Sequence, residues 1–178
     1  MAERFHIITG GPGSGKSSLI DALGSEGFAH MPEAGRAIIQ DQVSIGGTAL
    51  PWSDREAFAA LMLSWDMRSY REATSYPGSV IFDRGIPDVI GYLRLCDLPV
   101  PAATMCAAEI RRYAKRVFIA PHWPAIFAQD TERKQSPIEA EATYRAMIDA
   151  YSGLGYEIIQ LPLASVTERI AFVRSHIA

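Results

Sequence analysis

Four glycines, one lysine and three serines are concentrated in nine residues near the amino terminus. Residues 10–18 read GGPGSGKSS, so Gly10, Gly15, Lys16 and Ser17 complete the pattern G-x-x-x-x-G-K-S. Glycine lets the backbone adopt left-handed conformations, so that successive N–H groups can converge on an anion. A lysine here would reach the β- and γ-phosphates of a nucleotide, and a serine hydroxyl can coordinate Mg²⁺. The pattern predicts a nucleotide-binding loop.

The residues around this loop supply the context that the prediction requires. An apolar run, FHIIT at 5–9, precedes the loop, and a helix-like segment begins near Lys16, which would add the positive end of its dipole. A glycine-rich turn with an accidental GKS is the alternative, and the flanking strand and helix argue against it. The residues expected to bind ATP are Gly10, Gly11, Pro12, Gly13, Ser14, Gly15, Lys16, Ser17 and Ser18.

A second candidate for metal binding follows another apolar run. The segment SVIFDRG at 79–85 places Asp83 directly after three apolar residues. A carboxylate at the end of a buried strand is costly unless it has charged or hydrogen-bonding partners, and a metal ion with its waters would provide them. We expect Ser17 and Asp83 to hold Mg²⁺; the alternative is that Asp83 caps the following helix.

Short apolar runs alternate with helix-like segments along the whole chain. Strands are expected at 5–9, 28–31, 79–83, 116–120 and 156–161, and helices at 16–23, 33–42, 54–73, 86–95, 101–114, 138–152 and 167–176. A capping box of Ser53 and Glu56 is expected to begin the helix at 54–73. Strands that alternate with helices indicate a parallel sheet covered on both faces, in one α/β domain over residues 1–178.

The composition argues against binding to a nucleic-acid polymer or a membrane, and against two classes of nucleotide-binding protein. With 17 Lys and Arg against 20 Asp and Glu, the net charge of −3 gives no basic field for a nucleic-acid polymer. No segment is apolar enough to span a membrane, so we expect a cytoplasmic protein. The chain contains no asparagine, which excludes the N-K-x-D motif of Ras-type GTPases and the sensor asparagine of AAA+ motors. A homodimer is compatible with the sequence.

Several motifs together resemble a known family. Beside GGPGSGKSS, these are MPEAGRAII at 31–39, IFDRGIPD at 81–88, PHWPAIF and DTERK within 121–134, and GYEIIQLP at 155–162. They are similar to a small NTPase family labelled AAA-type ATPase-like, which is related to the ribosylnicotinamide kinase domain and to nucleoside and nucleotide kinases. The resemblance implies a three-layer α/β/α phosphate-loop fold whose five parallel strands have the order 2-3-1-4-5.

The resemblance also implies roles for residues on the acceptor side. Glu33 would orient the acceptor hydroxyl or accept its proton, although a helix amino terminus also favours such a charge. Arg84 would face the acceptor site, unless it forms a salt bridge with an acid such as Asp88. The polar segment 124–137 is a candidate lid, from which Arg133 would stabilise the charge of the transferred phosphoryl group.

We therefore expect ATP- and Mg²⁺-dependent phosphoryl transfer to a small acceptor such as a nucleoside or nucleotide. The expected catalytic residues are Lys16, Glu33, Asp83, Arg84 and Arg133. The alternative is a nucleotide-binding regulator that hydrolyses ATP slowly and acts on a protein partner.

Overall fold

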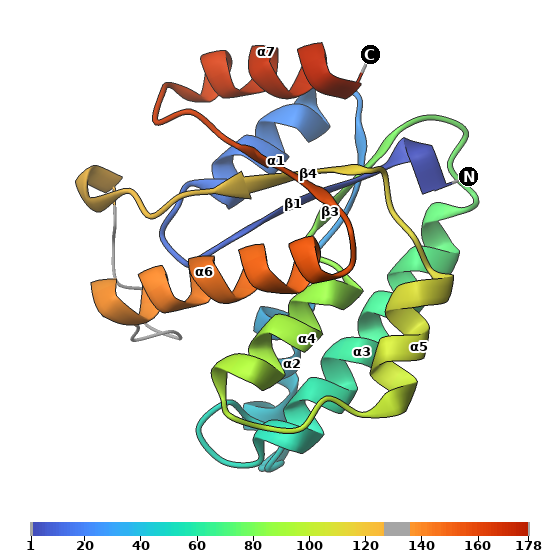
Figure 1. The fold of residues 1–178 in the computed structure, drawn as a ribbon, viewed down its shortest axis with the longest axis vertical. Helices are drawn as coiled ribbons and strands as arrows, with labels where there is room; N and C mark the ends of the chain where they lie inside the picture. Colours follow the sequence, from blue (N-terminus) through green and yellow to red (C-terminus); the bar gives the residue numbers. More distant parts are fainter. Residues whose placement is uncertain (1, 127–135, 178) are drawn as a thin grey trace.

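A five-stranded sheet forms the centre of the protein (Figure 1). The structure is a computed structural model that describes residues 2–126 and 136–177. All four strand pairs are parallel, and the strand order is β2-β3-β1-β4-β5, which confirms the order expected from the sequence. The strands are β1 (Phe5–Gly10), β2 (Ala29–Met31), β3 (Val80–Asp83), β4 (Arg116–Ala120) and β5 (Glu157–Gln160).

Helices cover both faces of the sheet and give the expected three-layer α/β/α fold. They are α1 (Lys16–Ser25), α2 (Ala34–Ile45), α3 (Arg55–Ala73), α4 (Ile86–Leu95), α5 (Ala102–Ile110), α6 (Pro137–Gly153) and α7 (Val166–Ile177), with short 3-10 helices η1 (Ala2–Arg4) and η2 (Pro124–Ile126). Helices α1 and α7 lie on one face, and α6 lies on the other (Figure 1). Among the described residues, no helix is long and apolar enough to cross a membrane.

Side chains from each central strand are buried on both faces of the sheet. Successive residues of a strand point to opposite faces, so β1 places Phe5 and Ile7 in one core and Ile8 in the other. The first core includes Tyr151 of α6, and the second includes Leu19 of α1. Because both faces are covered, these strands are continuous apolar runs in the sequence.

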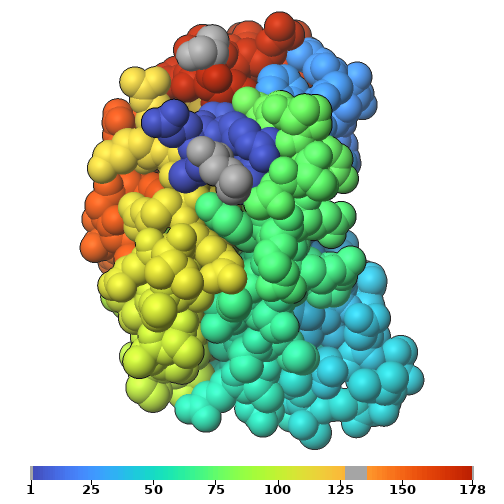
Figure 2. Space-filling model, turned by 90° about the vertical axis from the view of Figure 1, so that its right-hand side faces the viewer, coloured from blue at the N-terminus to red at the C-terminus, as the bar shows by residue number. Residues whose placement is uncertain are grey.

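The helices α2 to α5 form a flank that extends away from the sheet. Helix α4 packs against both α6 and α3, and α2 packs against α3. Figure 2 shows α3 and α5 side by side on the surface of this flank, where Leu63 and Met67 of α3 pack in a cluster with Ala107 and Ala108 of α5. A cavity lies between α2, α3 and α4 of this flank and α6.

Two of the helix ends that differ from the sequence prediction have a cause that the contacts show. The N-cap of α3 is Asp54, whose carboxylate accepts from the backbone N–H of Ala57 at 2.9 Å, so the expected capping box starting at Ser53 is wrong. Helix α5 ends at Ile110 and not at residue 114, because the chain must reach the sheet: the N–H of Ala114 already donates to the carbonyl of Phe5 at 2.8 Å.

Candidate functional site

The carboxyl ends of β1 and β3 lie beside each other at one edge of the sheet. Ile8 pairs with Asp83, and Gly10 at the end of β1 pairs with Ala120 of β4. After β1 the chain forms β2 and β3 on one side of β1, and only later forms β4 and β5 on its other side. The strand order therefore changes direction at β1. In open α/β sheets ligands bind in the crevice at such a point.

The glycine loop follows β1 directly and needs glycine for two physical reasons. Gly10 has φ 135°, and a Cβ on it would collide with the carbonyl oxygen of Ala120. Gly15 has φ 77° at the N-cap of α1, where it provides no side-chain oxygen to the first turn. The backbone N–H groups of that turn therefore have no side-chain cap, which suits them to bind an anion.

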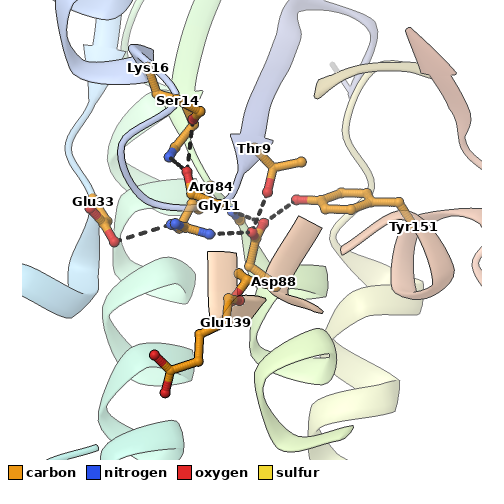
Figure 3. A network of polar contacts seen from close by, with 11 residues as sticks. Thr9, Gly11, Ser14, Lys16, Glu33, Arg84, Asp88, Glu139 and Tyr151 are labelled. Atoms are coloured by element: carbon orange, nitrogen blue, oxygen red, sulfur yellow. Dashed lines mark hydrogen bonds and ion pairs between the residues drawn. The ribbon is translucent and has the colours of Figure 1, made fainter. Parts of the chain in front are cut away.

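Lys16 and Ser14 hold the loop together from inside. The ammonium group of Lys16, only 7% exposed, donates to the carbonyl oxygen of Gly11 at 3.0 Å, and the Ser14 hydroxyl donates to the same oxygen at 2.8 Å (Figure 3). Ser17 and Ser18 are exposed at the start of α1. The nine residues expected to bind ATP thus lie on one loop and the helix turn that follows it.

Asp83 ends β3 with a carboxylate that suits a cation. Its Oδ1 atom is buried and has no hydrogen-bond partner in the described part of the chain. Burial raises the pKa of Asp83 to about 6, although the nearby Lys16 acts to lower it. Asp83 does not cap the next helix, because Gly85 occupies the N-cap position of α4.

The oxygen donors at this edge fit Mg²⁺, which prefers carboxylate and hydroxyl oxygens over nitrogen or sulfur. Within residues 2–126 and 136–177 no group of three or more His, Cys, Asp or Glu side chains could hold a metal ion. Asp83 and Ser17 could hold Mg²⁺ together with oxygens from a bound phosphate, as is usual where the metal binds with a nucleotide.

Arg84 follows β3 beside the glycine loop and forms ion pairs with residues of the helical flank (Figure 3). Its Nε donates to Glu33 at 3.1 Å and its Nη1 donates to Asp88 at 3.2 Å. Burial acts to lower the pKa of Arg84, but the carboxylates of Glu33, Asp88 and Asp83 more than offset this and raise it. Arg84 also has φ 70°, a left-handed conformation that is rare for a side chain of this size and that is often found at functional sites. Its N–H donates to the carbonyl of Ile8 at 3.0 Å.

Glu33 occupies the N-cap position of α2, but its side chain does not cap the helix. The carboxylate instead points toward Arg84, so the position both begins a helix and supplies a charge to the site. The salt bridge between Arg84 and Asp88, which sequence reasoning left as an alternative, is present together with the one to Glu33.

Asp88 of α4 is the centre of a buried hydrogen-bond network that sequence analysis did not predict. Its carboxylate accepts from the Thr9 hydroxyl at 2.5 Å, the Tyr151 hydroxyl at 2.5 Å and the N–H of Gly85 at 3.0 Å, as well as from Arg84. The network fixes the orientation of Arg84 against the end of β1 (Figure 3). The threonine in the apolar run of β1 is the one sequence signal that could have indicated it.

A cavity of about 380 Å³ opens next to the glycine loop. Pro12 of the loop lines it, as do Glu33, Arg84 and Asp88. Its other walls come from α2, α3, α4 and α6 and include Asp66 of α3, a second buried carboxyl group that sequence analysis missed. The glycine loop thus borders the cavity at Pro12.

Arg169 of α7 supports the loop from behind and was also missed. It is 1% exposed, donates from Nη1 to the carbonyl of Ser14 at 2.9 Å, and lies over the ring of Trp123 at 4.8 Å from its centroid. No sequence spacing links residues so far apart. The expected catalytic Arg133, with residues 127–135 of the candidate lid, lies outside the described residues.

Comparison with solved structures finds the same fold in several kinases. A deoxyadenosine kinase from M. mycoides with bound dATP matches with a TM-score of 0.70 and 13% identity, over 98% of this chain and 98% of that one. A NadR protein in complex with NR matches with a TM-score of 0.74 and 14% identity, over 99% of this chain and 51% of that one. The thymidylate kinase from Candida albicans has a TM-score of 0.63 and 11% identity, over 99% and 91% of the two chains.

At these identities the similarity establishes the fold. No curated protein matches the chain by sequence. A family model described as "AAA domain" matches residues 5–169, which is nearly the whole chain. The phosphate-binding loop, the order of the strands and this match agree with one another, and the chain belongs to that AAA domain family.

Proposed function

We propose that this protein transfers the γ-phosphoryl group of ATP, in a Mg²⁺-dependent reaction, to a hydroxyl group of a small molecule bound in the cavity. The observation that carries the proposal is a juxtaposition: Pro12 of the glycine loop lines the same cavity as Glu33 and Arg84, and Asp83 directly precedes Arg84 at the end of β3. The names of the proteins with the same fold, which include a deoxyadenosine kinase and a thymidylate kinase, support it.

On the nucleotide side, this chain supplies positive charge and N–H donors. The N–H groups at the start of α1 and the ammonium group of Lys16 would bind the phosphates, and Ser17 and Asp83 would hold Mg²⁺. The metal would neutralise the charge of the β- and γ-phosphates. To bind the phosphates, Lys16 would exchange its hydrogen bond with Gly11 for one with a phosphate oxygen.

On the acceptor side, Glu33 would orient the hydroxyl group and accept its proton. The ion pair with Arg84 holds the carboxylate in place, and a proton acceptor must be positioned in this way. Arg84 in turn is oriented by Asp88. We place Arg133 in the same reaction as a donor to the transferred group. Catalysis would then come mainly from positioning and from stabilisation of charge.

The test is ADP formation from MgATP with and without a panel of nucleosides, nucleotides and other small hydroxyl compounds. The proposal predicts that one class of acceptor stimulates ADP formation and becomes phosphorylated. Binding of MgATP with only slow turnover that no acceptor stimulates would contradict it and would favour a regulatory ATPase.

Glu33→Gln separates transfer from nucleotide binding. We expect kcat to fall by about 10²- to 10⁴-fold, the usual contribution of a general base, with the affinity for MgATP unchanged. Glu109→Gln, at an exposed position in α5, is the matched control and is expected to behave as wild type. If Glu33→Gln transfers phosphate at the wild-type rate, the assignment of Glu33 as the base is wrong.

A further inference from the structure

The cavity has one apolar side and one strongly acidic side. Apolar and aromatic side chains from four helices form the first side: Ile39, Phe58, Met62, Val89, Tyr92 and Met147. Phe58 and Tyr92 meet edge to face, with ring centroids 5.5 Å apart. A cavity of about 380 Å³ with such a wall can enclose a molecule that carries a flat ring.

Carboxyl groups outnumber guanidinium groups on the polar side. Among the described residues that line the cavity, the carboxyl groups belong to Glu33, Asp66, Asp88 and Glu139, whereas only Arg55 and Arg84 carry a positive charge. Arg84 is engaged by two of these carboxylates. Arg55 lies exposed at the first position of α3, where its Nε donates to the carbonyl of Pro51 at 3.0 Å. A second anionic group on an acceptor would therefore meet net negative charge, and repulsion of this kind selects against such ligands.

Asp66 differs from the other acidic residues of the cavity because it has no hydrogen-bond or ion-pair partner among the described residues. It is 8% exposed, lines the cavity, and interacts with Arg84 only through longer-range attraction. Asp88, with similar burial, accepts four hydrogen bonds. Burial raises the pKa of Asp66, and the negative charges of Asp88 and Glu33 add to this effect.

A buried carboxyl group without partners destabilises a fold, so its presence in a cavity wall calls for a ligand that provides them. A donor N–H or O–H group, or a positive charge, on the bound molecule would do so. An anionic group would increase the repulsion among Asp66, Glu33 and Asp88.

We propose that the acceptor is an unphosphorylated molecule of nucleoside type that is uncharged or cationic. It carries a ring, a hydroxyl group for transfer and further N–H or O–H groups. Asp66 binds those donors and thereby determines specificity. This inference rests on the proposed phosphoryl transfer and narrows its substrate. Nucleoside monophosphates, which carry the anionic group that the cavity opposes, are excluded as preferred acceptors.

The first test compares matched pairs of acceptors. Deoxyadenosine, thymidine and cytidine are each assayed beside their 5′-monophosphates, with MgATP as the donor. We expect the best unphosphorylated member to have a kcat/KM at least about tenfold above that of its monophosphate, the effect of one charged contact. A monophosphate that is the better acceptor would overturn the inference and leave the phosphotransferase intact. No transfer to any of the six compounds would overturn the inference, and the wider acceptor panel would then decide whether the phosphoryl transfer itself stands.

The second test replaces Asp66 by the isosteric asparagine. With the best acceptor, Asp66→Asn is expected to raise the acceptor KM by about tenfold or more, the contribution of a hydrogen bond to a charged group, and to leave the KM for ATP unchanged. Asp149→Asn, which changes an exposed aspartate of α6, is the matched control.

Protein stability distinguishes a ligand-binding role of Asp66 from a structural one. Because Asp66 has no hydrogen bond to lose, Asp66→Asn is expected to melt at the same temperature as wild type or a higher one at pH 7.5. A lower melting temperature, or a KM that rises equally for ATP and acceptor, would show that Asp66 supports the fold and would overturn the inference. An unchanged acceptor KM would overturn it as well.

Discussion

Replacing Asp88 by asparagine is expected to destabilise the fold strongly although the side chain keeps its shape. One carboxylate oxygen accepts from Thr9 and Arg84, and the other accepts from Gly85 and Tyr151. An asparagine has only one acceptor oxygen, and its NH₂ group is a donor. Whichever way the amide is oriented, its NH₂ group would face a group that can only donate, either Arg84 or the N–H of Gly85, and the hydroxyl beside it would have to turn and accept.

The expected loss follows from the number and kind of these bonds. A buried neutral hydrogen bond contributes about 1 kcal/mol and one to a charged group about 1.5–3 kcal/mol. Asp88→Asn also removes one of the carboxylates that compensate the charge of Arg84, at a position only 6% exposed. We expect a loss of about 3–5 kcal/mol in the free energy of unfolding, or a melting temperature lower by about 10 °C for a chain of this size.

Urea unfolding at pH 7.5 measures this loss, with Tyr151→Phe as the matched comparison. Burial raises the pKa of Tyr151, so its hydroxyl stays a donor at this pH, and Tyr151→Phe removes one bond to Asp88 at a cost of about 1–2 kcal/mol. If Asp88→Asn costs less than about 1 kcal/mol, or no more than Tyr151→Phe, the network does not hold the site together as argued.

Two other variants test the charge at the edge of the sheet and the support of the loop. The pKa of Asp83 is about 6, above the value of 3.8 usual for aspartate, so its ionisation destabilises the nucleotide-free fold increasingly as the pH rises from 4 to 6. Asp83→Asn should therefore raise the melting temperature at pH 7.5 and not at pH 4. An equal gain at both pH values would contradict this cause. Arg169→Met loses the hydrogen bonds to Ser14 and Pro162 and should lower the free energy of unfolding by about 2 kcal/mol. It should also speed amide hydrogen exchange in residues 10–15. Exchange at the wild-type rate would show that the loop does not depend on Arg169.

The sheet could be predicted from the sequence because its strands are buried on both faces. Continuous apolar runs such as FHIIT and RVFIA leave few other structures for segments of this length, and the helices between them set the parallel direction. Helix ends were less predictable. Ser53 and Asp54 are both good N-cap residues, and only the position of the helix decides that Asp54 accepts from Ala57.

Some features of the candidate site are determined by a short segment of sequence, and others depend on residues far apart in the chain. The glycine loop and Asp83 could be recognised because a short segment and its flanking strand are sufficient. The partners of Asp88 could not, because Thr9 and Tyr151 lie 79 and 63 residues away from it in the chain. Asp66 reads as one polar residue on an amphipathic helix, and only the packing of α3 against α4 shows that it is buried.

Titration calorimetry with MgATP tests the central claim most directly, because every proposed step begins with a nucleotide on the glycine loop. The account predicts heat of binding at a single site and a higher melting temperature in the presence of MgATP. Both effects should be lost in Lys16→Ala and kept in Lys115→Ala, which removes an exposed lysine far from the loop in sequence. Wild-type protein that gives no heat with MgATP and melts at the same temperature with and without it would contradict the account.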